Sequence, residues 1–327
     1  MICEFEHKIF SSDKNSFDAL ALETFHFQYR HNKVYRQYAD TIHTDIHAIK
    51  LVKQIPFLPI SFFKIHAVCT GTFDPEAVFE SSGTTQTTPS SHRVKKLALY
   101  KQSFITAFGL FYGSIQDYCI LALLPAYLER KHSSLVIMTD ELIKKSGHKQ
   151  SGFYLYNYSE LAVVLQQLEM AKQKTLLIGV TFALLDFAEQ FPLALKNTIV
   201  METGGMKGRR EELIREEVHA ALRNAFQIDK IHSEYGMTEL LSQAYSTGEG
   251  IFNCPPWMKI LMREEDDPFA VHSNAGKGVI NIIDLANIYS CSFIATDDAG
   301  RLYKDGSFEV LGRMDNTDIR GCSLLAV

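Results

Sequence analysis

The feature that most constrains the fold is an alternation of apolar, strand-like runs with segments of helical periodicity in the middle of the chain. The runs expected to be buried strands are residues 117–124, 134–138, 175–180 and 197–201. The segments with apolar residues at helical spacing are residues 159–172, 182–191 and 211–225. Alternation of this kind predicts an α/β fold with a mostly parallel sheet flanked by helices.

The pattern changes after residue 245. Short strand-like runs at residues 278–284, 292–296 and 307–311 are separated by turn signals, among them Asp305-Gly306. We therefore expect a small antiparallel β appendage on the α/β core. The expected division is one core over residues 1–315, with its α/β part ending at about residue 245 and its β-rich part covering residues 246–315. A short tail over residues 316–327 follows this core.

Composition excludes several classes of protein. The 33 basic and 38 acidic residues give a formal net charge of −5, which argues against a nucleic-acid partner. Glu4 and Glu6 stand where a secretory signal needs basic residues, and the longest apolar stretch, residues 119–128, is interrupted by Pro125 and is too short to span a bilayer. The 6 cysteines are scattered, as is typical of reduced thiols. We expect a cytoplasmic protein without a membrane span.

A hydroxyl-rich sequence, ESSGTTQTTPSSH, occupies residues 80–92. Its hydroxyls and the backbone amides around Gly83 suit the oxygens of a phosphate chain. A helix expected over residues 92–112 would direct the positive end of its dipole to the same place. The alternative is a solvated Ser/Thr turn that caps this helix. A Walker A sequence is absent.

A second polar sequence is YGMTE at residues 235–239, after an apolar stretch that ends at Ile231. At the end of a strand, Tyr235 can stack on an aromatic base and Gly236 allows close approach of the backbone. Thr238 can bond a phosphate, and the carboxylate of Glu239 is a hard oxygen ligand for Mg²⁺. The alternative is an ordinary strand-to-helix turn with Glu239 as an acid of the first helical turn.

A third polar sequence, TDDAGR, occupies residues 296–301 and is followed by GRMD at residues 312–315. A carboxylate held at the end of a strand can accept hydrogen bonds from both hydroxyls of a ribose, and a nearby arginine can contact sugar or phosphate. The alternative is a set of polar hairpin turns.

In this order the three sequences resemble the SSGTTG, YGxTE, TGD and GRxD motifs of the ANL superfamily of adenylate-forming enzymes. Within that superfamily the chain is similar to the LuxE-type acyl-protein synthetases, which are long-chain-fatty-acid–protein ligases. The resemblance extends from about residue 56 to the last residue, and the first fifty positions contribute little. The supporting sequences include LPAYLER at 124–130, ETGGMKG at 202–208, CPPWM at 254–258 and IRGC at 319–322.

The resemblance implies a role for individual residues. The phosphates of ATP would be held by Ser81, Ser82, Gly83, Thr84 and Thr85. Gly204 and Gly205 would form the floor under the adenine, with Tyr235 and Gly236 beside it. Thr238 would touch the α-phosphate, and Glu239 would bind Mg²⁺. Asp298 would bind the ribose with Arg313 adjoining it, and Asp315 would stand at the hinge position.

The chain departs from the superfamily pattern at three points. Gln86 replaces a common glycine, and the usual lysine is missing, although Arg93, Lys95 or Lys96 can supply positive charge. Asp297 replaces the middle residue of TGD, which is expected to alter that turn. The sequence ends at Val327, so we expect the small C-terminal domain of ordinary acyl-CoA synthetases to be absent.

The resemblance therefore implies an AMP-forming acid–thiol ligase that uses ATP and Mg²⁺. Such an enzyme activates a carboxylic acid, here a long-chain fatty acid, as an acyl-adenylate. Cys322 would then carry the acyl group as a thioester and pass it to a partner, an acyl reductase or an acyl carrier protein. Three alternatives stay open: Cys322 is a small buried residue, the acceptor is a diffusible thiol such as CoA or a separate carrier, or the chain is a nucleotide-binding scaffold with little activity.

Overall fold

The computed structural model describes residues 2–81, 88–124, 132–204 and 213–314. The chain divides into two units. Unit 1 combines Met1–Phe73 with Pro256–Val327, and unit 2 is Asp74–Pro255. Of the helices in the described ranges, not one is long and apolar enough to cross a membrane.

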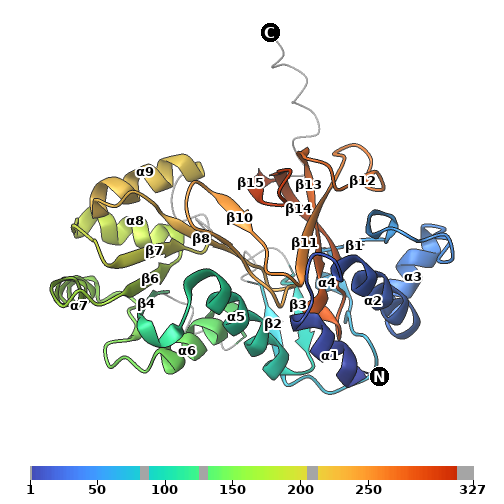
Figure 1. Ribbon diagram of the computed structural model, residues 1–327, viewed down its shortest axis with the longest axis horizontal. Helices are drawn as coiled ribbons and strands as arrows, with labels where there is room; N and C mark the ends of the chain where they lie inside the picture. The colour runs from blue at the N-terminus through green and yellow to red at the C-terminus, as the bar shows by residue number, and fades with distance from the viewer. Residues whose placement is uncertain (1, 82–87, 125–131, 205–212, 315–327) are drawn as a thin grey trace, which may run out of the picture. The chain divides into compact units, whose positions relative to one another are not determined.

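Unit 2 is built on parallel strands in the order β5-β4-β6-β7-β8, to which β9 and β10 add antiparallel to one side (Figure 1). Helices α8 and α9 cover one face of this sheet, and α5 and α6 cover the other. All residues of the two central strands β4 and β6 are buried, as expected for strands covered on both faces. The predicted α/β fold is confirmed. The strands are β4 Cys119–Leu123, β5 Gly152–Phe153, β6 Thr175–Gly179, β7 Thr198–Glu202, β8 His232–Tyr235, β9 Ala244–Ser246 and β10 Ile251–Asn253; the helices are α5 Leu97–Tyr112, α6 Ser134–Ser146, α7 Tyr158–Met170, α8 Thr181–Gln190 and α9 Arg215–Phe226.

One predicted strand is wrong. Residues 134–138 form the start of α6, because the Ser133 hydroxyl accepts a hydrogen bond from the Val136 N–H and so caps a helix there. At its other end α6 stops at Gly147, which has a left-handed conformation with φ 65°. The apolar run of five residues is therefore part of a longer segment of helical periodicity.

A separate two-stranded hairpin pairs β2 (Ala77–Glu80) with β3 (Ser91–Val94). The predicted helix over residues 92–112 therefore starts later than expected, at Leu97, because residues 91–94 form a strand that pairs with β2. The Ser90 N–H donates to the Ser81 hydroxyl at 2.8 Å, which closes the described part of this hairpin.

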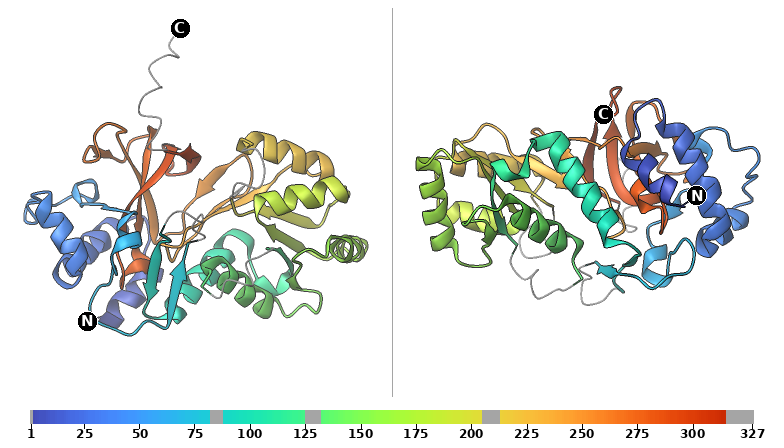
Figure 2. Two further views of the ribbon diagram at one scale, coloured as in Figure 1. Left: turned by 180° about the vertical axis from the view of Figure 1, so that it is seen from behind. Right: turned by 60° about the horizontal axis from the view of Figure 1, so that its bottom comes forward.

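Unit 1 contains antiparallel strands in the order β12-β11-β13-β14-β15, with β1 parallel to β14. Gly278 and Gly300 lie opposite each other in β13 and β14, and a Cβ on either would lie 2.6 Å from a backbone oxygen of a neighbouring strand. Figure 2 shows these strands from two further directions. The strands are β1 Leu58–Pro59, β11 Met258–Arg263, β12 Val271–His272, β13 Gly276–Asp284, β14 Phe293–Leu302 and β15 Phe308–Arg313.

The N-terminal helices of unit 1, α1 (Ile2–Phe10), α2 (Phe17–His31) and α3 (Lys33–Thr41), pack with the C-terminal part of the chain, and the short helix α4 (Phe62–Ile65) follows β1. The buried Gln28 amide donates to the carbonyl of Asn287 at 2.9 Å, and the Asn32 amide donates to that of Ser290 at 2.8 Å. Trp257 is also fully buried and lies edge-on to Phe10. Chain segments more than 200 positions apart therefore share one core.

Candidate functional site

Several predicted site residues in unit 2 lie where parallel strands end. Gly204 follows β7, and the sequence 235–239 begins at the last residue of β8. In open parallel sheets, ligands bind outside the carboxyl ends of the strands. This edge of the unit 2 sheet is therefore the candidate site.

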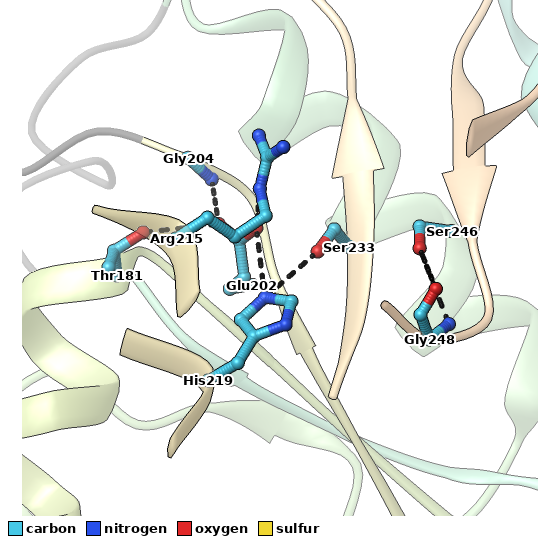
Figure 3. Close-up of polar contacts among 8 residues, drawn as sticks. All are labelled: Thr181, Glu202, Gly204, Arg215, His219, Ser233, Ser246 and Gly248. Carbon is cyan, nitrogen blue, oxygen red and sulfur yellow. Dashed lines mark hydrogen bonds and ion pairs between the residues drawn. The ribbon is translucent and has the colours of Figure 1, made fainter. Parts of the chain in front are cut away.

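A buried carboxylate, that of Glu202, is the centre of the polar contacts at this edge (Figure 3). Its Oε2 accepts hydrogen bonds from the Gly204 N–H at 2.7 Å and from the Thr181 hydroxyl at 3.1 Å. Its Oε1 lies 3.9 Å from Arg215 Nε and 3.8 Å from His219 Nε2. Residues on both sides of positions 205–212 in the sequence thus contact one carboxylate.

Glu202 stays charged despite its burial. Burial alone would raise its pKa, but the contact with His219, the charge of Arg215 and hydrogen bonds from Ser233 and Gly204 hold the pKa of this carboxyl below its usual range. Ser233 also lies 3.4 Å from His219 Nε2, so the serine and the glutamate both approach the same ring nitrogen. This arrangement differs from a Ser-His-acid triad, in which the acid contacts the other nitrogen. The contacts of Glu202 hold the Gly204 backbone and the Arg215 side chain in place.

Arg215 and His219 also line a cavity of about 210 Å³ between α9 and the turns at residues 229–231 and 249. The Arg215 guanidinium lies over the Phe252 ring at 5.2 Å, and a Cβ at Gly250 would lie 3.0 Å from Arg215 Cδ. Basic and acidic side chains both line this cavity: Arg215, Glu216, His219, Arg223, Asp229, Lys230 and Glu249, with Ile231.

A second acidic side chain, Glu234, belongs to β8, and its pKa is raised where that of Glu202 is lowered. Burial and the nearby charge of Glu202 raise the pKa of Glu234 to about 8, so this carboxyl is mostly protonated at neutral pH. A Cβ at Gly236 would lie 2.4 Å from Glu234 Oε1. A side chain at position 236 would therefore require the Glu234 carboxyl to move.

The YGMTE sequence is an irregular connection between two strands. Residues 236–243 contain no helix, so the alternative of a strand-to-helix turn is wrong and Glu239 is not in a first helical turn. Glu239 is buried, with 5% of its surface exposed, and the Tyr235 ring lies edge-on to Phe252 at 5.9 Å.

The first and second polar sequences meet at His92. This residue of β3 is buried, and its Nδ1 lies 2.9 Å from the Thr238 carbonyl oxygen. The structure thus joins the hairpin that includes Ser81 to the connection that includes Thr238.

In unit 1, Asp298 and Arg313 are direct partners across β14 and β15. Asp298 lies inside β14, so the prediction of a carboxylate at a strand end is wrong, and Asp297 belongs to the same strand instead of a turn. The Arg263 guanidinium donates to the Thr296 carbonyl at 2.6 Å, and the Thr296 hydroxyl accepts from the Asp298 N–H at 3.1 Å. The backbone beside Asp298 is therefore well fixed, whereas the Arg313 side chain is exposed.

The remaining predicted residues lie outside the described part of the chain, namely Ser82, Gly83, Thr84, Thr85, Gly205, Asp315 and Cys322. Sequence reasoning missed the roles of Glu202 and His92. For Glu202 a signal existed, since it is an acid at the end of an apolar, strand-like run and two positions before a glycine pair.

The chain matches one family and several solved structures. The model of the family described as "Acyl-protein synthetase, LuxE" matches residues 6–129. The expectation that the resemblance begins near residue 56 is therefore wrong. No curated protein matches the chain.

A structure of 2-hydroxyisobutyryl-CoA ligase in complex with R3-HIB-AMP has a TM-score of 0.62 and 10% identity, and the match covers 94% of this chain and 70% of that one. ATP-bound MatB from Rhodopseudomonas palustris has a TM-score of 0.54 and 17% identity, with 74% of this chain and 49% of that one covered. An ATP-bound RpMatB-BxBclM chimera has a TM-score of 0.56 and 17% identity, and the match covers 74% of this chain and 48% of that one.

The match thus covers about half the length of the MatB structures. At these identities the likeness establishes the fold. The chain has the α/β fold of these structures, and its residues 6–129 match the model of the LuxE acyl-protein synthetase family.

Proposed function

We propose that this chain activates a carboxylic acid with ATP as an acyl-adenylate. The observation that carries the proposal is the assembly at the carboxyl edge of the unit 2 sheet: Gly204, Tyr235 and Thr238 lie where ligands bind in open α/β sheets, and a buried acid, Glu239, follows directly. The family match and the ATP-bound state of the MatB structures support the same reaction.

In the proposed first step, a carboxylate oxygen of the acid attacks the α-phosphorus of ATP. A new P–O bond forms, the bond from the α-phosphorus to the bridging oxygen breaks, and pyrophosphate leaves with the electron pair. Charge builds on the phosphoryl oxygens in the transition state, so fixed donors nearby accelerate the step. In this proposal Thr238 contacts the α-phosphate, and Tyr235 and Gly204 enclose the adenine.

The residues present fit Mg²⁺. This ion commonly uses one or two protein carboxylates, with water and substrate phosphates completing its shell, and Glu239 offers one hard carboxylate. When bound there, Mg²⁺ supplies neutralisation of charge on the phosphates.

For the second step we propose transfer to Cys322, near the C-terminus. The thiolate attacks the acyl carbonyl carbon, a C–S bond forms, and AMP leaves with the electron pair of the broken C–O bond; the thiol proton goes to solvent. A thiol of ordinary pKa, about 8.5, is a few per cent ionised at neutral pH, which suffices for attack on an acyl-adenylate. The proposed substrate is a long-chain fatty acid, and the proposed recipient is an acyl reductase or an acyl carrier protein.

A second candidate is transfer to a diffusible thiol. It is favoured by the structural likeness to 2-hydroxyisobutyryl-CoA ligase, whose name specifies CoA as the acceptor.

Exchange of labelled pyrophosphate into ATP tests the first step. The intact chain is assayed with MgATP and a panel of acids from acetate to palmitate together with aromatic acids. We expect exchange that depends on the acid and is greatest with long-chain acids. Absence of exchange with every acid would favour a nucleotide-binding scaffold and reject the proposal.

Replacing Glu239 tests the metal role. Glu239→Ala should lower the exchange rate by about 10²–10³, the effect of removing one transition-state stabiliser. Exchange by the variant at the unaltered rate, at every Mg²⁺ concentration, would remove Glu239 from the site.

Cys322→Ser separates the two acceptors. Exchange should be unchanged, whereas the acyl label on the protein that hydroxylamine releases should disappear. Cys69→Ser serves as the matched thiol control and should keep the label. Retention of the label in Cys322→Ser would favour another acceptor.

A further inference from the structure

His92 combines three features that a simple packing residue does not need. It is a polar side chain with only 1% of its surface exposed. Its Nδ1 lies 2.9 Å from a backbone oxygen that is 146 positions away in the sequence, that of Thr238. This contact links β3, next to the hydroxyl-rich sequence, with the connection that includes Glu239.

The protonation of His92 follows from its surroundings. Burial lowers the pKa of His92 to about 4, so the ring is neutral at physiological pH. A carbonyl oxygen can only accept a hydrogen bond, so Nδ1 must carry the proton in this contact. The rings of His92 and Phe79 are nearly perpendicular with centroids 6.2 Å apart, and the Phe79 and Tyr100 ring centroids are 5.1 Å apart in a similar edge-type contact. Burial therefore disfavours an imidazolium at this position and keeps the ring as a neutral donor.

We propose that His92 is a positioning residue for adenylation: its Nδ1–H fixes the Thr238 carbonyl and so sets the place of Thr238 and Glu239 relative to β3. This inference rests on the proposed function. In the transition state, phosphate oxygens need donors and a metal ligand at fixed separations, and displacement of a group by about 1 Å can cost about 10²-fold in rate. The His92 side chain thus makes a direct hydrogen bond from the hairpin to the connection over residues 235–239.

Two substitutions distinguish this role from packing. Asn places its amide nitrogen near the position of Nδ1, whereas Gln places its amide nitrogen near the position of Nε2. Both side chains are neutral and polar, and neither is much larger than histidine. We therefore expect His92→Asn to keep exchange within about 3-fold of the wild type, and His92→Gln to lose about 30-fold or more in kcat, with a smaller change in KM for ATP.

Thermal unfolding of both variants is the control for folding. The inference holds if the two variants unfold at similar temperatures and differ in kcat as stated. Equal activity of the two variants would overturn it, and so would an equal loss. A wild type that exchanges with no acid overturns the proposed function itself, so the two failures are distinguishable.

A measurement that does not use activity covers the case in which a variant fails to fold. Long-range ¹H–¹⁵N NMR spectra of the wild-type histidine rings, with His92 assigned from a variant, should show a neutral ring protonated at Nδ1 at pH 7. A ring protonated at Nε2 alone would contradict the inference.

Discussion

The two units hold their candidate site residues by different means. In unit 2, Glu202 is buried and charged, and groups from α8, α9, β8 and the connection after β7 converge on it. In unit 1, Asp298 and the exposed Arg313 are paired in register across β14 and β15, and Arg263 and Thr296 fix the backbone beside them. A buried charge network is sensitive to any change in charge, whereas register in a sheet survives side-chain replacement.

This contrast separates two roles for a carboxylate, one that holds the fold, as at Glu202, and one proposed to bind a ligand, as at Asp298. Glu202 is a buried acid that contacts groups of several elements of unit 2, so its substitution should disturb both folding and activity. Asp298 is a half-buried acid in a strand whose backbone is held by pairing with β15, so we expect its substitution to affect ligand binding more than folding.

The largest effect is expected for Glu202→Ala. Removal of the carboxylate leaves the Gly204 N–H without its acceptor and Arg215 without its counter-ion. The free energy of unfolding should fall by about 3 kcal/mol, and the rate of pyrophosphate exchange should fall by about 10²-fold. Denaturant unfolding and pyrophosphate exchange measure the two effects.

Glu202→Gln is the matched control, because its amide oxygen can still accept from Gly204 and Thr181. Its losses should be clearly smaller than those of the alanine variant. If both variants behaved as the wild type, Glu202 would have no positioning role, and the contrast between the units would disappear.

An intermediate effect is expected for Asp298→Asn. The amide accepts only with its oxygen and lacks charge, so it should hold a ribose less well. KM for ATP should rise about 10-fold, while the unfolding midpoint stays unchanged. A large loss of stability would show that Asp298, like Glu202, is structural, and a KM equal to that of the wild type would remove it from the ribose site.

The smallest effect is expected for Glu234→Gln and is a dependence on pH. In the native state this carboxyl has a pKa of about 8, against 4.5 for the ordinary value, so the native state keeps a proton that the unfolded state has released. The wild type should therefore lose stability as pH rises from about 4.5 to 8. The glutamine variant lacks this loss, and its melting temperature relative to the wild type should rise by several degrees between pH 6 and pH 9. A constant difference across this range would argue against the raised pKa.

Sequence reasoning predicted the fold class because hydrophobic patterns report burial. The runs at residues 119–123 and 175–179 are buried on both sides, and continuous apolar sequence is the expected signature of such strands. The same rule failed at residues 134–138, where a short apolar run is part of a helix. Its signals were the Ser133 cap and the buried positions at helical spacing, Met138, Thr139, Leu142 and Ser146.

The candidate site was only partly predictable. Tyr235, Thr238 and Glu239 form a contiguous sequence, so their proximity follows from the chain itself. The contacts of Glu202 with His219 and of His92 with Thr238 join separate elements, and nothing in the local sequence specifies them. How the polar residues of unit 2 act together with Asp298 and Arg313 stays a prediction, as does the role of Cys322.

The close approach at Gly278 and Gly300 has an evolutionary consequence. Alanine at either position would place a methyl group 2.6 Å from a main-chain oxygen, so selection should retain glycine there whatever ligand the chain binds. In a comparison of relatives these two sites would be as invariant as residues that bind ATP. Their invariance would record the steric limits of a sheet, and it should not be counted as evidence of chemistry.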